Sequence, residues 1–187
     1  MGRIERIVIL GCPGAGKSTL GSHLADDLEA THVELDALFH GPYWEPTPIP
    51  EFRAKVTHAL ASGRWIVDGN YRPVEDLVQG GADTIIWLDI ARWRVMSRII
   101  RRSLRRLITR EEFWNGNRES RRNLASHDPE LNVILWAWQH HPKYRERYRL
   151  WMDNGTWASK DVYRLRSPTE VRFVRSSLPR NLAQIER

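Results

Sequence analysis

The 187-residue sequence predicts an α/β fold, a three-layer α/β/α sandwich around a five-stranded parallel sheet. Short, nearly continuous apolar segments recur along the chain, as in strands that are covered on both faces, and segments of helical periodicity separate them. A glycine-rich segment at residues 11–18 joins the first apolar segment to the first helical one. Strands that alternate with helices in this way form a parallel sheet between two helical layers.

The glycine-rich segment reads Gly11-Cys12-Pro13-Gly14-Ala15-Gly16-Lys17-Ser18 and fits G-x-x-x-x-G-K-[ST], the phosphate-binding P-loop. A strand at 6–10 precedes it and a helix at 17–29 follows, so a chance match in a turn is a poor explanation. Glycines let backbone N–H groups converge on phosphate, and the helix adds its positive dipole end. We expect Lys17 to reach the β- and γ-phosphates of ATP and Ser18 to ligate Mg²⁺. The expected nucleotide-binding residues are Gly11, Pro13, Gly14, Ala15, Gly16, Lys17, Ser18 and Thr19.

The remaining elements follow from apolar periodicity and from glycine and proline signals. Strands are expected at residues 32–35, 65–67, 84–88 and 161–165. Helices are expected at 52–60, 74–78, 91–108, from 131 onward with a break or kink at His141-Pro142, and after Ser167-Pro168. The proline-rich segment 41–50 is expected to be a loop.

The helix expected at 91–108 has two faces of different character. One face carries apolar side chains: Trp93, Met96, Ile100, Leu104 and Leu107. The other carries arginines: Arg94, Arg98, Arg101 and Arg105. These arginines, with Arg118, Arg121 and Arg122 after them, are candidates for neutralising phosphate charge during phosphoryl transfer. About two to four of them are expected on phosphate, and the rest form a solvated basic face.

Chain length and composition indicate one domain spanning residues 1–187, with an acceptor-binding region at 35–64 and an arginine-rich lid region at 91–128. The net charge of +6 suits an anionic partner such as a nucleotide, a phosphorylated substrate or nucleic acid. No run approaches the roughly 18 apolar residues of a membrane span. The single cysteine excludes an internal disulfide and a cysteine-based zinc site, which favours a cytoplasmic location. The oligomeric state is not indicated.

Three aspartates follow strands of the expected sheet, at the edge where parallel α/β sheets bind ligands. Asp68 or Asp89 could anchor Mg²⁺, while Asp36 lies nearer the acceptor and could bind or deprotonate its hydroxyl. The alternative for each aspartate is a capping or turn role. No pair of histidines has a convincing metal-ligand spacing.

With the P-loop, Asp36, the Asp68-Gly69 turn and the Arg98 helix in this order, the chain resembles the adenylate-kinase-like group of P-loop nucleoside and nucleotide kinases. More narrowly, it resembles small bacterial proteins known as DNA topology modulation proteins. The third strand of adenylate kinases ends in Asp-Gly-Phe-Pro-Arg, where this chain has Asp68-Gly69-Asn70-Tyr71-Arg72. The resemblance implies that Asp68 supports Mg²⁺ and that Asp68, Gly69 and Arg72 contact the acceptor.

The resemblance extends to two further segments. The lid helix of adenylate kinases carries Arg-Ile-Val-Gly-Arg-Arg, and Arg98-Ile99-Ile100-Arg101-Arg102 is similar but one residue shorter, which implies that Arg98 and Arg102 clamp phosphate. The loop at Ser167-Pro168 resembles the one that borders the adenine of ATP. One position departs from the group, because Phe39 stands where adenylate kinases have the arginine that holds AMP. AMP is therefore in doubt as the acceptor, and Asp36 also resembles the substrate-side carboxylate of shikimate-type kinases.

These observations predict a kinase that transfers the γ-phosphate of ATP·Mg²⁺ to a small acceptor such as a nucleotide, a nucleoside or another hydroxyl or phosphate compound. Catalysis would depend on Lys17, Asp36, Arg98 and Arg102. The alternative is a nucleic-acid-binding P-loop ATPase or regulator whose arginine helix lies on phosphate backbones. The kinase is favoured because no separate DNA-reading module is present. A GTPase is disfavoured because no Asn-Lys-x-Asp sequence occurs.

Overall fold

The structure, a computed structural model, describes residues 5–61, 63–109, 112, 114–117, 124–129 and 131–185. Its centre is a five-stranded sheet in the order β2-β3-β1-β4-β5, and every neighbouring pair is parallel. The strands are β1 (Arg6–Gly11), β2 (Thr31–Glu34), β3 (Trp65–Asp68), β4 (Thr84–Leu88) and β5 (Asp161–Leu165). The predicted parallel sheet of five strands is confirmed.

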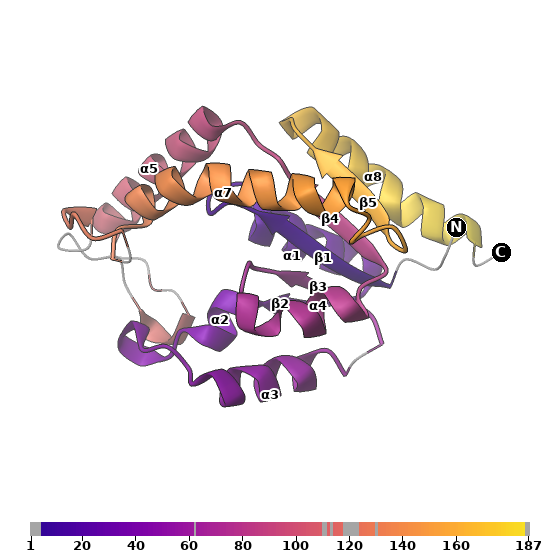
Figure 1. Cartoon of the computed structure of the whole chain (residues 1–187), viewed down its shortest axis with the longest axis horizontal. Helices are drawn as coiled ribbons and strands as arrows, with labels where there is room; N and C mark the ends of the chain where they lie inside the picture. The colour runs from indigo at the N-terminus through magenta and orange to yellow at the C-terminus, as the bar shows by residue number, and fades with distance from the viewer. Residues whose placement is uncertain are drawn as a thin grey trace.

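Helices cover both faces of this sheet. They are α1 (Lys17–Leu28), α2 (Leu35–Phe39), α3 (Ile49–Ala59), α4 (Glu75–Gly81), α5 (Arg92–Thr109), α7 (Val133–Asp153) and α8 (Pro168–Ile185). Figure 1 shows the long helix α7 crossing the near side of the sheet, with α1 behind it. None of the helices in the described ranges combines the length and the apolar character that crossing a bilayer requires.

Alternation along the strands divides the core into two apolar clusters. Ile7 and Ile9 of β1 point to the cluster that contains apolar residues of α1, α5 and α8. Val8 and Leu10 point to the opposite cluster, which contains residues of α3, α4 and α7. This period of two, with both faces apolar, is why the strand sequences are nearly continuous runs of apolar residues.

The strand order places the P-loop at the centre of the sheet. Strand β1 lies between β3 and β4, so the direction in which strands are added reverses beside it, and open α/β sheets bind ligands at such a reversal. Residue Asp68 pairs in register with Ile9 of β1 on one side and with Glu34 of β2 on the other. The parallel register therefore brings Asp68 beside the start of the P-loop.

Two local predictions were wrong in their boundaries. Strand β2 ends at Glu34, and Asp36 lies in the short helix α2 instead of at a strand end. Helix α2 forms there because Leu35 turns into the core, where it is buried. Within the proline-rich segment expected to be a loop, α3 already begins at Ile49, with Pro50 in its first turn, where a missing N–H costs nothing.

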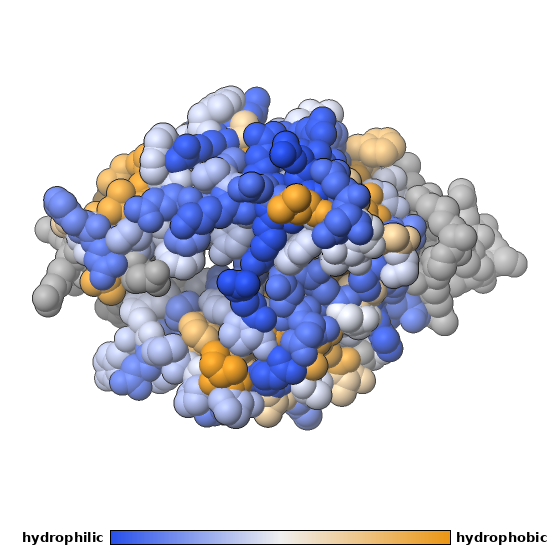
Figure 2. All heavy atoms as spheres, in the orientation of Figure 1, coloured by the Kyte–Doolittle hydropathy of each residue, from blue (hydrophilic) through white to orange (hydrophobic). Residues whose placement is uncertain are grey.

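The buried face of α5 also differs from the prediction. Its buried residues are Val95, Met96, Ile99 and Ser103. Of the residues on the apolar face that the sequence indicates, Met96 is buried, while Trp93, Ile100 and Leu104 are exposed. In Figure 2, orange atoms lie beside blue ones at the edge where Figure 1 places α5. Apolar side chains occur on two sides of the helix, so periodicity alone could not identify the side that meets the core.

Helix α7 continues through Pro142, where the sequence predicted a break or kink. Proline has no N–H, so the carbonyl of Trp138, four residues earlier, loses its helical donor. Arg92 at the start of α5 replaces that donor, since its Nη2 donates to the Trp138 oxygen at 2.5 Å. The Arg92 guanidinium also lies 3.4 Å from the centre of the Trp138 ring. A side chain from a neighbouring helix thus compensates for the proline.

This compensation leads to a stability prediction. Substituting Arg92→Ala leaves the Trp138 carbonyl without a donor, so we expect the free energy of unfolding in denaturant to fall by about 1 kcal/mol. The loss should be clearly smaller in a Pro142→Ala background, because alanine at this position restores the helical N–H. The control Arg94→Ala, which removes an exposed arginine that stacks on Trp93, should have little effect. Equal losses from Arg92→Ala in both backgrounds would contradict this account.

Candidate functional site

The P-loop has the backbone conformation that phosphate binding requires. Gly14 and Gly16 have φ angles of 79° and 104°, which L-residues rarely adopt, and Gly16 forms the N-cap of α1. A Cβ atom on Gly14 would lie 2.5 Å from Ile99 Cγ1, so the loop also needs glycine to pack under α5. Lys17 and Ser18 are the first residues of α1, where free backbone N–H groups and the helix dipole favour an anion.

Asp68 is bound to the P-loop helix and to strand β2. Ser18 Oγ donates to Asp68 Oδ1 at 3.1 Å. His32 Nε2 lies 2.8 Å from Asp68 Oδ2, and the Asp68 side chain is only 3% exposed. Since a carboxylate only accepts hydrogen bonds, Nε2 of His32 carries the proton that joins the pair. One buried carboxylate therefore connects the predicted Mg²⁺ ligand Ser18 with His32, which was not predicted to be part of the site.

Arg98 is the arginine of α5 that the structure brings to the P-loop. Its Nη1 donates to the Ala15 carbonyl at 3.0 Å. The same atom lies 3.7 Å from the position that a Cβ on Gly16 would occupy. Because the neighbouring Ile99 packs on Gly14, the helix holds Arg98 directly beside the glycine-rich turn.

Asp36 faces a small group of polar and aromatic side chains. The Tyr71 hydroxyl donates to Asp36 Oδ1 at 2.7 Å and lies 3.2 Å from His40 Nε2. Burial, and after it the negative charge of Asp36, raises the pKa of Tyr71 well above its ordinary value. Burial lowers the pKa of His40, and Asp36 opposes this effect. Tyr71 therefore stays protonated and His40 is neutral at neutral pH, which suits hydrogen bonding to an uncharged group.

Phe39 is part of an aromatic cluster beneath this group. Its ring centre lies 4.7 Å from that of Tyr71 and 5.1 Å from that of Phe52. Phe39 thus packs against aromatic rings on two sides.

A segment far along the chain, residues 114–117, lies against the acceptor-binding region. Asn117 Nδ2 donates to the Gly41 carbonyl at 2.9 Å, and Asn117 Oδ1 accepts from the Trp44 N–H at 2.8 Å. Asn115 Nδ2 donates to the His40 carbonyl, and Trp114 Nε1 donates to Glu34 at 3.3 Å. Asn117 is buried, so its amide is part of the structure here and not a chance surface contact. These contacts join the predicted lid region to the predicted acceptor region.

Asn70 holds the end of β1 in place. Its Nδ2 donates to the Gly11 carbonyl at 2.6 Å, and its Oδ1 accepts from the Tyr148 hydroxyl of α7 at 2.9 Å. Asn70 occurs in the sequence within the segment compared with adenylate kinases, and no role was predicted for it. A polar side chain in place of phenylalanine, directly after the Asp-Gly pair, was the available signal.

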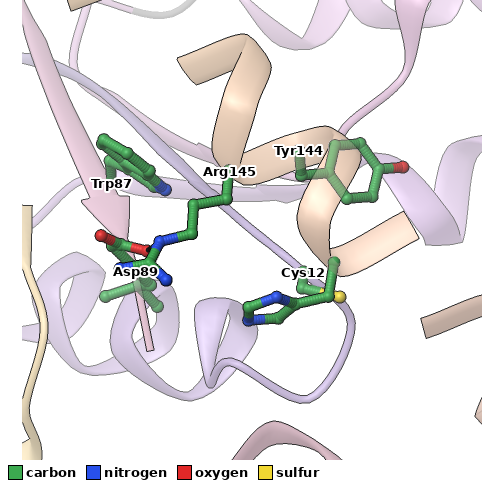
Figure 3. Close-up of a pocket in the computed structure, with 7 residues that line it drawn as sticks. Cys12, Trp87, Asp89, Tyr144 and Arg145 are labelled. Carbon is green, nitrogen blue, oxygen red and sulfur yellow. Dashed lines mark ion pairs between the residues drawn. The ribbon is translucent and has the colours of Figure 1, made fainter. Parts of the chain in front are cut away.

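Asp89 has a different environment from Asp68. Arg164 donates to it through Nε and Nη2, at 2.9 and 2.6 Å, and Arg145 Nε lies 2.9 Å from its Oδ1. Figure 3 shows Arg145 reaching from α7 to the Asp89 carboxylate beside the Trp87 ring. Asp89 is thus paired with two arginines, whereas Asp68 is hydrogen-bonded to Ser18 of the P-loop. No cluster of three or more metal-ligating side chains of the histidine, cysteine, aspartate or glutamate type occurs within the described ranges.

Other predicted site residues lie at exposed positions or at the start of α8. Arg72 starts a 3-10 turn and is exposed, and Arg102 is exposed on α5. Ser167 caps α8, since its Oγ donates to Glu170 Oε1 at 3.0 Å and accepts from the Glu170 N–H at 3.2 Å. Their roles at ATP or the acceptor stay predictions, as does that of Thr19. Arg118, Arg121 and Arg122 lie outside the described residues.

Comparisons with known proteins agree with this architecture. No protein-family model matches the chain. An adenylate kinase from Cyanothece sp. is 34% identical over 65 residues, which are 35% of this chain and 32% of that protein. The solved structure of shikimate kinase from Acinetobacter baumannii in complex with shikimate superposes with a TM-score of 0.54 at 16% identity, over 97% of this chain and 94% of that one. This chain shares the fold of that protein.

The fold is the three-layer α/β/α arrangement of P-loop NTPases, as predicted. A gluconokinase from Sinorhizobium meliloti 1021 aligns over the full length of both chains with a TM-score of 0.49 and 16% identity. The expected resemblance to adenylate-kinase-like P-loop kinases is confirmed. The aligned part of the adenylate kinase spans about a third of that protein's length.

Cys12, inside the P-loop of this P-loop kinase fold, is buried with its thiol near the Ala137 carbonyl. Burial raises the pKa of the Cys12 thiol to about 11, although Lys17 and Arg92 lower it in part. We expect its thiolate fraction near pH 8 to be about 100-fold below that of an ordinary thiol. Alkylation by iodoacetamide should be at least that much slower in the native protein than in denaturant. Equal rates in both conditions would contradict the burial of this thiol.

Proposed function

We propose that the protein transfers the γ-phosphate of ATP to a small acceptor that carries a hydroxyl group. The hydrogen bond from Ser18 of the P-loop helix to the buried Asp68 carboxylate is the observation that carries this proposal. It joins the phosphate-binding loop to an acidic group on the neighbouring strand β3. Asp36 lies at the same edge of the sheet. P-loop NTPases use such a pair of hydroxyl and carboxylate to hold Mg²⁺ on the β- and γ-phosphates.

The donor set fits Mg²⁺, which prefers carboxylate oxygen and otherwise keeps its waters. Ser18 Oγ and Asp68 Oδ1 already lie within hydrogen-bond distance, so both oxygens face the same side of the loop. Mg²⁺, when bound there, would neutralise charge on the transferring phosphate. Lys17 and the first N–H groups of α1 hold the triphosphate, and Arg98 adds a guanidinium beside Gly16.

The acceptor would lie over α2, between Asp36 and the P-loop. There the acceptor oxygen bonds to the γ-phosphorus as the bond to the β–γ bridging oxygen breaks and ADP leaves. Asp36 takes the acceptor proton, and Tyr71 fixes the orientation of the carboxylate. The Nδ1 atom of His40 is buried without a hydrogen-bond partner among the described residues, which suits a second polar group of the acceptor. Because Phe39 replaces the AMP-binding arginine, AMP is not the preferred acceptor.

Residues 114–117 would limit access of water to the transferring phosphate. Their contacts reach Glu34 before Asp36 in the sequence and Gly41 and Trp44 after it, and phosphoryl transfer to an acceptor competes with hydrolysis unless water is excluded. We therefore assign these residues to the closing part of the lid region proposed at 91–128.

The first test is the nucleotide site itself. Substituting Lys17→Ala removes the ammonium group that contacts the β- and γ-phosphates, so we expect turnover of ATP·Mg²⁺ to fall by about 100-fold or more. ADP release should be measured with a panel of nucleosides, nucleotides, sugars and other hydroxyl compounds. The matched control Lys143→Ala removes an exposed lysine of α7 and should keep full activity.

Two outcomes of that panel would contradict the kinase proposal. One is unchanged turnover in the Lys17→Ala variant. The other is ATP hydrolysis that only DNA or RNA stimulates and that falls steeply with salt, which would favour a nucleic-acid-dependent ATPase. ADP formation in equal amount to one phosphorylated small molecule supports the proposal.

Arg72 provides a separate test of the acceptor side. We expect Arg72→Ala to raise the acceptor KM or lower kcat by about 10-fold or more while ATP binding is unchanged, because the residue follows the Asp68-Gly69 turn on the acceptor side of the sheet. Calorimetric titration with ATP would measure nucleotide binding. Arg172→Ala, on the exposed side of α8, is the control. A variant that loses ATP affinity instead would place Arg72 on the donor side.

A further inference from the structure

Gly21 in the middle of α1 is unexplained by the P-loop. A glycine inside a helix costs about 1 kcal/mol relative to alanine, so its presence calls for a physical reason. Gly21 is buried and faces the ring of His32 on β2. A Cβ atom at Gly21 would lie 2.4 Å from His32 Nε2 and 3.0 Å from Cδ2. Even the smallest side chain would therefore displace the imidazole.

The imidazole that Gly21 accommodates is the one that binds Asp68. His32 Nε2 lies 2.8 Å from Asp68 Oδ2, while Asp68 Oδ1 accepts from Ser18. The carboxylate is thus held through both oxygens, one by β2 and one by α1. With the Asp68 side chain 3% exposed, each lost partner leaves a buried oxygen without a donor.

We propose that Gly21 and His32 form a built-in support for the magnesium site of the P-loop. His32 is a positioning residue, which fixes Asp68 so that Oδ1 points to Ser18 and to the metal. Because Gly21 has no side chain, it leaves space beside α1 that the His32 ring can fill. The proposal rests on the proposed function for its magnesium, but the coupling between Gly21 and His32 is a property of the folded chain alone.

The arrangement has the form that supports metal ligands in many proteins, in which a group that does not touch the metal orients one that does. Removing such a supporting group typically weakens metal affinity by about 10- to 100-fold. The supporting group here is the N–H donor of His32. It can occupy its position only because residue 21 carries a hydrogen atom in place of a methyl group. A purely structural histidine would have no reason to affect magnesium more than nucleotide.

The first experiment measures magnesium dependence. In His32→Ala, the Mg²⁺ concentration for half-maximal ATP binding in calorimetry, and for half-maximal turnover, should rise by about 10- to 100-fold. Binding of ATP without Mg²⁺ should change less than about two-fold, because the P-loop amides and Lys17 are intact. His32→Gln keeps an N–H donor at similar reach and should recover most of the loss. Equal weakening of ATP with and without Mg²⁺ would overturn the proposal.

The second experiment uses a double-mutant cycle on the protein without nucleotide. Gly21→Ala should lower the denaturation midpoint in the native background, because the methyl group displaces His32 and leaves Asp68 without this partner. In the His32→Ala background the same substitution should raise the midpoint, because alanine favours the helix once the ring is gone. Gly21→Ala alone should also reproduce the magnesium phenotype of His32→Ala. If Gly21→Ala destabilised the protein equally in both backgrounds, Gly21 would be needed for a reason other than the space that His32 fills.

These outcomes separate the present proposal from the proposed function. If the cycle changes sign but no variant affects magnesium, the support exists and Asp68 does not serve a metal. If Lys17→Ala leaves ATP binding intact, the nucleotide site itself is misassigned, whatever the cycle shows.

Discussion

The Asp68 carboxylate is the constraint on which the arrangement of the site depends. An ionised carboxylate in an apolar sheet is stable only with hydrogen-bond donors, and its two oxygens receive them from different elements. Ser18, in the first turn of α1, binds one oxygen, and His32 on strand β2 binds the other. The sheet register, which pairs Asp68 with Ile9 and Glu34, places these donors around it. The P-loop and the end of β2 are thereby fixed relative to each other.

The other side of the P-loop is fixed by packing. Ile99 of α5 contacts Gly14, and Arg98 holds the Ala15 carbonyl, so α5 cannot shift without moving the loop. Helix α5 is in turn braced against α7 by Arg92, which supplies the donor that Pro142 lacks. Asn70 adds a further link, because it joins the end of β1 to Tyr148 of α7. A phosphate-binding loop that is held from both sides needs little rearrangement when it binds its ligand.

The sequence predicted the sheet, the P-loop and the position of Asp68, because apolar runs, glycine spacing and strand ends follow local rules. It did not predict that α5 buries Ile99 instead of Ile100, since both sides of that helix carry apolar residues and tertiary packing decides between them. Pro142 was expected to interrupt α7, and the compensating Arg92 lies 50 positions away along the chain. His32, His40 and Asn70 were missed for the same reason: their partners are distant in sequence and leave no local spacing pattern.

The hydrogen bonds between residues 114–117 and the predicted acceptor-binding region have a consequence for which side chains there can change. The amides of Asn115 and Asn117 grip main-chain carbonyls at positions 40 and 41, and the N–H of residue 44, not the side chains found there. Any residue with a free backbone N–H and carbonyl offers the same hydrogen-bonding groups. Side chains at positions 41 and 44 can therefore change while these hydrogen bonds persist, whereas position 40 is also held by stacking of the His40 imidazole on the Trp114 ring.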